Sequence, residues 1–474
     1  MGHRRGESRQ QAALFPLMLD ELVATDSLVR VVDAWVSSLN LRTLGFAKAQ
    51  AQVMGAPPYD PGDLLKLYVW GYLGGQRSTR RLEQQCHSNV ECMWLLGRLA
   101  PDHKTIANFR RDNVTALVAA CAAFVQFARS QRLIAGVTVA VDGSKVRAVA
   151  SRKAIIGQRQ LQEQARRNAQ EIEHYLRLLD EQDRQEDAQP RADGDVQQAL
   201  AQLRRQQADV QGELQRLVEQ GRSTRVEGED DARVMPSLHV APGYNIQTAV
   251  DTDSHLIVAH QVTNEVTDQR QLQPMGQAVV QALGQPCAIT ADAGYANGEH
   301  IAQLQQQGVT TYVATNRSVN HHGGGQLYDR SAFSYASEAD AFTCPAGKAL
   351  PRRGEDARSK LVIYMASAKD CGSCALKPEC TTAKRRSVSR HIYEEALQAN
   401  AQRLESQPEM MRLRRSTVEH PFDFLKNRVM INGRLLLRGL EGATAETSIA
   451  VLAYNIKRTF NMKGSTWVHQ ALRG

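Results

Sequence analysis

The stretch Val137-Thr-Val-Ala-Val-Asp-Gly-Ser-Lys145 decides the fold. Its β-branched and small apolar residues predict a buried strand that ends at Asp142-Gly143, a pair typical of a turn. A second run, Cys287-Ala-Ile-Thr-Ala291, has the same character and is followed directly by Asp292. Turn formation is the more ordinary role for either aspartate alone. Two such strand ends in one α/β sheet favour a shared site at one edge of that sheet.

The chain around these runs alternates strand and helix patterns. Further strands are predicted at 145–149, 244–251, 256–260 and 310–315, and helices at 268–283 and 298–307. From about 396 onward the pattern is helical. Such alternation is typical of an α/β domain that covers 136–315 and resumes at 396–463.

One segment interrupts this pattern with a different periodicity. Within residues 155–220, apolar residues recur at alternating spacings of three and four, with one break at 187–194. This spacing predicts two helices that fold back as an antiparallel coiled-coil hairpin. The hairpin could pair subunits or span DNA, and an inert insertion explains the pattern equally well.

Residues 316–395 show no regular pattern and hold half of the eight cysteines. These four are Cys344, Cys371, Cys374 and Cys380. Four thiolates, two of them in a Cys-x2-Cys pair, can enclose one structural Zn²⁺. Four unpaired thiols of a cytoplasmic protein are the alternative.

Residues 1–135 have the pattern of short helices separated by glycines. Ser78 can cap one helix, and Asp102 can cap another, which carries the basic residues Lys104 and Arg110. Short helices with basic residues suit a helix-turn-helix-like DNA-binding domain. Plain helical packing explains the same pattern.

The net charge of +8 is concentrated near the C-terminal end. Residues 381–474 contain 16 Lys and Arg against 8 Asp and Glu, so this fifth of the chain alone carries +8. Local positive charge suits a polyphosphate partner, and a solubilising surface explains it equally well.

No apolar run reaches the roughly 20 residues that span a bilayer, and the first residues do not resemble a signal peptide. We therefore expect a cytoplasmic protein with reduced cysteines and no membrane partner.

A third acidic residue with cationic neighbours lies near the C-terminal end, in the stretch 414–426. Arg415 lies four residues before Glu419 and Lys426 seven after it, and these offsets place all three on one helix face. A carboxylate between two cations suits a site for Mg²⁺ and phosphate, whereas a surface ion pair is the ordinary alternative. Pro421 cannot donate a hydrogen bond inside a helix, so it predicts a kink or a helix start beside Glu419.

Motifs spread over nearly the whole chain resemble those of one family. In chain order they are Tyr59-Asp-Pro61, Ser78-Thr-Arg-Arg81, Pro101-Asp-His-Lys-Thr-Ile106, Phe109-Arg110, Val141-Asp-Gly-Ser-Lys145, Asp231-Ala-Arg-Val-Met235, Gly243-Tyr-Asn-Ile-Gln247, Asp292-Ala-Gly-Tyr-Ala-Asn297, Val418-Glu-His-Pro-Phe422 and Ala453-Tyr-Asn-Ile-Lys-Arg458. Each motif is weak alone, but the full set in this order is specific. With them the chain resembles the bacterial insertion-sequence transposases of the DDE class.

The resemblance implies an RNase H-like mixed sheet with flanking helices and an all-helical N-terminal domain. It also implies two insertions, the coiled-coil hairpin and a small cysteine-rich segment of the kind that often precedes the catalytic glutamate in this family. The expected organisation is a DNA-binding-type domain at 1–135, a catalytic domain at 136–315 plus 396–463, insertions at 155–220 and 316–395, and a tail at 464–474.

The activity implied by the resemblance is DNA strand cleavage and strand transfer at the ends of an insertion sequence. In the family the matching acids bind two Mg²⁺ or Mn²⁺ ions, a role that carries over to Asp142, Asp292 and Glu419. The glutamate helix of the family often follows Tyr-x2-Arg-x3-Glu-x6-Lys. Arg415, Glu419 and Lys426 fit this pattern, and an arginine at position 412 replaces the tyrosine. That departure concerns the grip on a DNA end and not the metal ligands.

We expect DNA contacts from basic residues near these motifs, namely Arg415, Lys426, Lys145, Lys104 and Arg110. The implied partners are double-stranded DNA with terminal inverted repeats and a target DNA, bound by a homodimer in the bacterial cytoplasm at the nucleoid. One alternative is a nuclease of the same fold that cuts without joining. Another is a decayed or repurposed transposase that binds DNA without catalysis, and the presence of all three acids argues against it.

Overall fold

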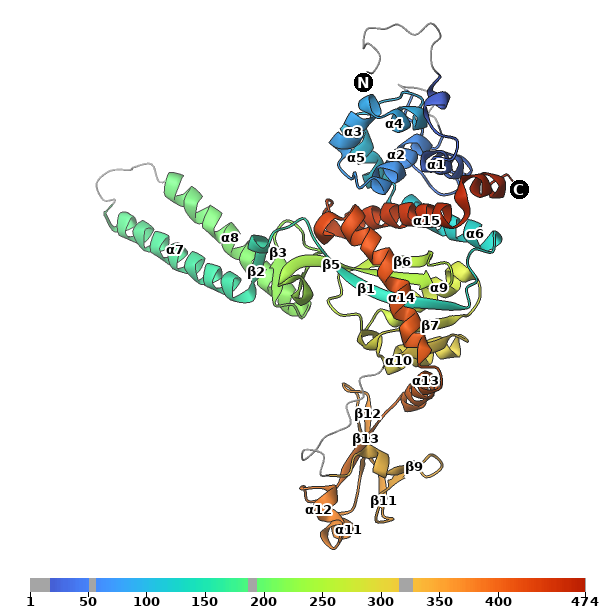
Figure 1. Cartoon of the computed structure of the whole chain (residues 1–474). Coiled ribbons are helices and arrows are strands. Elements are labelled where there is room, and N and C mark those ends of the chain that lie inside the picture. The colour runs from blue at the N-terminus through green and yellow to red at the C-terminus, as the bar shows by residue number, and fades with distance from the viewer. Residues whose placement is uncertain (1–17, 51–56, 186–193, 315–326, 474) are drawn as a thin grey trace, which may run out of the picture.

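The computed structural model describes residues 18–50, 57–185, 194–314 and 327–473. A six-stranded sheet lies at its centre (Figure 1). Its strands, in spatial order, are β6 (Ile257–Thr263), β5 (Ala241–Asp251), β1 (Thr138–Arg147), β7 (Ala288–Ala291) and β8 (Thr310–Val313), and β4 (Arg233–Met235) also pairs with β5. The strands β6, β5 and β1 are antiparallel neighbours, whereas β7 and β8 run parallel to β1. This order confirms the predicted RNase H-like mixed sheet.

The first strand is longer than predicted. The sequence indicated a strand to residue 141 and a turn at Asp142-Gly143, but β1 continues through this pair to Arg147, with Gly143 opposite Gln247 of β5. The turn interpretation was therefore wrong. A Cβ atom on residue 143 would collide with the side-chain ends of Gln247 and Asp268, so close packing and not a turn favours glycine here.

Helices cover the sheet and connect its strands. They are α9 (Leu272–Leu283), α10 (Gly298–Gln306), α13 (Glu394–Ser406), α14 (Glu409–Asp423) and α15 (Gly439–Ala471). A π-helical segment, η6 (Phe424–Val429), follows α14 directly. Single-turn helices are η1 (Leu19–Leu22), η2 (Arg152–Ala154), η3 (Pro236–Leu238), η4 (Ala293–Tyr295), η5 (Arg330–Ala332) and η7 (Ile431–Gly433). Residues 464–471, expected to be a tail, continue α15 after a break at Gly464.

The N-terminal helices pack against the C-terminal helix α15. They are α1 (Leu28–Ser37), α2 (Pro61–Leu73), α3 (Thr79–Ser88), α4 (Val90–Leu95), α5 (His103–Asp112) and α6 (Val114–Ser130). Helices α1, α2 and α6 contact α15, and α15 in turn contacts β6. Buried aromatic residues such as Trp35, Tyr72 and Phe124 belong to the same apolar cluster as the strands β1 and β7. The helical region and the sheet therefore share one continuous core.

Two predicted helix caps have different outcomes. The Asp102 side chain accepts from the amides of Lys104 and Thr105 at 2.8 and 3.0 Å, so it caps α5 as predicted. The Ser78 side chain makes no cap bond at the start of α3, which corrects that expectation.

Among the described residues, no single helix is long and apolar enough to cross a membrane. The bent pair α5 and α6 passes that test only when both helices are counted together.

The predicted coiled-coil hairpin is confirmed. It consists of α7 (Gln158–Gln185) and α8 (Gly194–Glu219), which pack along each other and project away from the sheet (Figure 1). A short ladder of β2 (Ile155–Gly157) and β3 (Thr224–Val226) closes its base. Leu161, Val210 and Leu217 are buried between the two helices.

The cysteine-rich segment is not irregular, which corrects the expectation from the sequence. Its five-stranded antiparallel sheet contains β9 (Ser334–Ala336), β10 (Ala341–Thr343), β11 (Ala349–Asp356), β12 (Leu361–Met365) and β13 (Ser387–His391), with α11 (Ala368–Gly372) and α12 (Lys377–Cys380) between the last two. Phe342, Leu350 and Tyr364 contribute to a separate small core. This unit extends from the sheet beyond α13, on the side opposite the N-terminal helices (Figure 1).

Candidate active site

Asp142 and Asp292 meet where the sheet opens beside β1. The last residue pair between β1 and β7 is Ala140 with Thr290, and β7 ends at Ala291. Because β1 continues beyond this point, Asp142 lies beside the place where Asp292 leaves β7. The carboxyl ends of parallel strands are where an α/β sheet gathers its functional groups.

One nitrogen atom of Arg414 contacts both aspartates. Its Nη2 atom lies 2.6 Å from Asp142 Oδ1 and 3.1 Å from Asp292 Oδ2. The two carboxylate oxygens are therefore at most about 5.7 Å apart, the sum of those distances. Helix α14, which packs on β1 and β7 and crosses the sheet in Figure 1, carries this arginine. The exposed fractions of the side chains are 11% for Arg414, 21% for Asp142 and 45% for Asp292.

Negative charge is costly at this position. The pKa of Asp142 is raised to about 6, first by burial and then by the neighbouring carboxylates of Asp292 and Asp268. The Arg414 guanidinium and the Gly143 amide lower it, but they do not outweigh burial. A buried group of carboxylates whose charge is incompletely balanced attracts cations.

A third carboxylate, Asp268, lies beside this pair. It accepts hydrogen bonds from Lys145 Nζ at 2.7 and 2.8 Å, from Asn245 Nδ2 at 2.8 Å and from Gln247 Nε2 at 2.7 Å. The hydroxyl of buried Tyr295 donates to the Gln247 carbonyl and ties the same network to the segment after Asp292. Lys145, predicted to contact DNA, is thus engaged by a carboxylate in this structure.

Asp268 and Arg414 were not predicted from the sequence. Asp268 follows no strand directly, so it lacks the signal that identified the other two aspartates. The available signal lay on β5, where Asn245 and Gln247 are polar residues two positions apart on a strand that is buried throughout. Alternate residues of a strand share one face, so this pair indicated a polar partner on that face.

The structure does not bring Glu419 to the aspartates. Glu419 is exposed on α14, and among the described residues it has no hydrogen-bond or ion-pair partner. It lies five residues after Arg414, which separates the two positions by about 140° around the helix and about 7.5 Å along it. Pro421 lies inside α14, not at a helix start, and the π-helical segment η6 follows.

The other basic residues differ in accessibility. Lys104 and Arg415 are exposed and Lys426 is half-buried. Arg110 is only 4% exposed, because α5 turns it inward with its apolar face, and its guanidinium donates to the Tyr72 hydroxyl at 3.1 Å. In this structure Arg110 belongs to the core and cannot reach a DNA phosphate.

The fit to metal ions can be judged from the donor atoms. Among the described residues, no three His, Cys, Asp or Glu side chains are arranged so that they could already hold a metal ion. The aspartate pair nevertheless fits divalent cations. Its hard carboxylate oxygen atoms, at most about 5.7 Å apart, are the ligand type that Mg²⁺ prefers, and Asp142 and Asp292 would hold such an ion.

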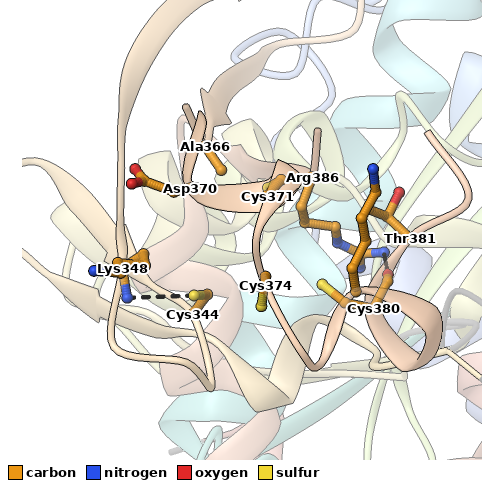
Figure 2. Close-up of a pocket in the computed structure, with 10 residues that line it drawn as sticks. Cys344, Lys348, Ala366, Asp370, Cys371, Cys374, Cys380, Thr381 and Arg386 are labelled. Carbon is orange, nitrogen blue, oxygen red and sulfur yellow. Dashed lines mark hydrogen bonds between the residues drawn. The ribbon is translucent and has the colours of Figure 1, made fainter. Parts of the chain in front are cut away.

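The four cysteines named above line one small cavity of about 30 Å³ (Figure 2). Cys344 follows β10, Cys371 lies on α11, and Cys380 ends α12. The backbone amide of Lys348 donates to Cys344 Sγ at 3.3 Å. Burial raises the pKa of Cys380, and the three other sulfurs add to this effect because they are close by.

Two family models match the chain. A transposase domain (DUF772) matches residues 17–112, and a transposase DDE domain matches residues 239–456. The chain belongs to the DDE transposases. These are enzymes that cut and transfer DNA, and they generally use divalent metal ions. Asp292 and Glu419 of this transposase lie inside the second matched range, whereas Asp142 lies between the two ranges.

Among solved structures, the transposase is similar to the cryo-EM structure of a piggyBac transposase synaptic complex with hairpin DNA. The identity is 9%, the TM-score is 0.32, and the alignment covers 94% of this chain and 79% of the other. A similarity of that size carries no argument about this site. A comparison with curated proteins finds no match.

Proposed function

We propose that this transposase cleaves DNA strands at the ends of an insertion sequence and joins them to a target DNA. One observation carries the proposal: aspartates from two separate strands converge on a single nitrogen of Arg414 at the open edge of an RNase H-like sheet. Such a pair of oxygen ligands suits Mg²⁺ or Mn²⁺ and an in-line phosphoryl transfer.

Each part of the site has a distinct role in this proposal. Divalent ions, when bound, would activate the attacking hydroxyl and stabilise the leaving oxygen. Asp142 and Asp292 would hold these ions. Asp268 fixes Lys145 and the polar face of β5 behind them. Exposed Arg415 and Lys104 would offset the charge of DNA phosphates.

Glu419 would complete the carboxylate set after a movement of α14. The family motif supports this role, and α14 already reaches the aspartates at Arg414. Pro421 removes one backbone donor from the helix, and the π-helical segment η6 follows within a few residues. Both features weaken the regular α-helical hydrogen bonding, so we place the rotation of the helix here.

The joining reaction can be tested with a labelled, pre-cut element end and a target plasmid. Wild-type protein with Mg²⁺ should attach the label to the plasmid. Glu419→Gln should reduce joining by roughly a hundredfold or more, because a lost metal ligand removes transition-state stabilisation. The control Glu409→Gln changes an exposed glutamate on the same helix and should join normally. Cleavage without any joining by the wild type would instead support the nuclease alternative.

The proposed partners follow from the same reaction. We infer a homodimer that binds terminal inverted repeats and target DNA in the bacterial cytoplasm, since joining requires two ends to be held together. The α7–α8 hairpin, which projects from the body, is the candidate element for contact between subunits (Figure 1).

We also propose that the four cysteines around the small cavity bind one structural Zn²⁺. They supply four sulfur ligands, and a backbone amide already bonds to one of them. Protein purified without chelator should contain about one equivalent of zinc. The double variant Cys371→Ser/Cys374→Ser should contain none, whereas Ser373→Ala between them should retain it. Zinc-free wild-type protein after expression with added zinc would contradict the proposal.

A further inference from the structure

We propose that Arg414 holds the place of a metal ion between Asp142 and Asp292, so that metal binding and the Arg414 contact exclude one another. The inference rests on the proposed function, which makes these two aspartates metal ligands. It adds that α14 supplies a built-in counter-cation, which the ions must displace before the site is loaded.

The geometry makes the two states incompatible. Arg414 Nη2 lies 2.6 Å from Asp142 Oδ1 and 3.1 Å from Asp292 Oδ2, so it stands between the two oxygens. A divalent ion held by these two aspartates would need the oxygen lone pairs that the Arg414 contacts now use. The ion and the guanidinium would therefore compete for the same two carboxylates.

The contacts of Arg414 also allow its release. Among the described residues, the two carboxylates are its only hydrogen-bond or ion-pair partners, and its buried Nε atom has none. Arg77 differs, because it bonds both to a buried carboxylate and to the Arg434 carbonyl. Loss of the carboxylates to a metal would therefore leave the Arg414 guanidinium free to contact a DNA phosphate, which it can bind with two donors.

The charges around the site determine whether Arg414 raises or lowers the affinity for a metal ion. Lys145 is engaged by Asp268, so Arg414 is the cation that neutralises the pair Asp142 and Asp292. Removal of its charge leaves two neighbouring carboxylates without a cation of their own. These carboxylates then attract a divalent ion more strongly, and the ion no longer has a competitor. Arg414 thus lowers the metal affinity of the DNA-free enzyme.

The test is a calorimetric titration of the full-length, DNA-free protein with Mn²⁺ at about pH 8, where Asp142 is charged. Arg414→Gln should lower the Kd for Mn²⁺ by roughly tenfold or more, because one competing charge is removed. The matched control Arg412→Gln should bind as the wild type does. Arg412 is an exposed arginine on the same helix. Asp142→Asn should abolish or strongly weaken binding in either background.

The outcomes separate this inference from the proposed function. If Asp142→Asn loses Mn²⁺ and Arg414→Gln binds no more tightly than the wild type, the place-holding role of Arg414 is wrong and the metal site stands. If Asp142→Asn binds as the wild type does, the metal site itself is wrong. Arg414→Met, which keeps the aliphatic stem without the charge, serves if the glutamine variant does not fold, and it should show the same gain in affinity.

Discussion

Asp142→Asn should abolish DNA strand cleavage while leaving the protein folded and able to bind DNA. Asparagine has nearly the shape of aspartate but cannot supply a charged metal ligand. Loss of several kcal/mol of metal-based transition-state stabilisation corresponds to a rate lower by roughly a thousandfold or more. The measurement is the rate of nicking of a duplex that contains an element end, at saturating Mg²⁺. Near-normal nicking by the purified variant would overturn the assignment of Asp142.

The stability of the same variant provides an independent check. The folded-state pKa of Asp142, about 6, is raised above the ordinary aspartate value of 3.8, so the folded state binds this proton more tightly than the unfolded chain. The resulting stabilisation is fully present below about pH 4 and is lost as the pH rises through 6. Asparagine does not titrate, so the metal-free Tm of Asp142→Asn should fall less than that of the wild type between about pH 5 and 8. Asp253→Asn, an exposed change in the β5–β6 turn, should follow the wild-type profile.

The parts of the fold that the sequence predicted well are those with a strong periodic signal. The hairpin α7–α8 spans more than fifty positions of regular spacing, and the two aspartate strands are rich in β-branched residues. The cysteine-rich sheet was missed because strands such as β9 and β11 are largely exposed and carry few buried apolar residues, so no alternating pattern is evident. At Asp142-Gly143, local turn propensity was misleading because pairing with β5 keeps both residues in the strand.

Helix α14 at the candidate site shows more clearly what residue spacing cannot predict. The spacing of Arg415 and Glu419 predicted a shared helix face, and both residues are exposed together on α14. Spacing cannot say which face of the helix packs on the sheet. The structure turns Arg414, one position earlier, toward the aspartates. Such information resides in the packing of α14 against β1 and β7 and not in the helix sequence itself.

Glu446→Ala should destabilise the protein by about 3–5 kcal/mol, the usual effect of breaking a buried ion pair. Glu446 on α15 is 0% exposed and pairs with buried Arg77, which directly precedes the Ser78 motif. Its second oxygen accepts from the backbone amides of Leu436 and Leu437 at 2.9 and 3.2 Å. The carboxylate therefore joins the N-terminal helices, α15 and the loop after the π-helical segment. Removal leaves a buried guanidinium and two amides without their acceptor.

Thermal and urea unfolding of a set of variants can separate the ion pair from simple packing. Glu441→Ala, on the exposed first turn of the same helix, should change stability by no more than about 0.5 kcal/mol. The double variant Arg77→Met/Glu446→Leu should recover much of the loss, because apolar side chains of similar volume remove the unpaired charge. The two single substitutions should then be strongly non-additive. If the double variant is instead as unstable as the sum of its parts, Arg77 and Glu446 stabilise the fold separately and not as an ion pair.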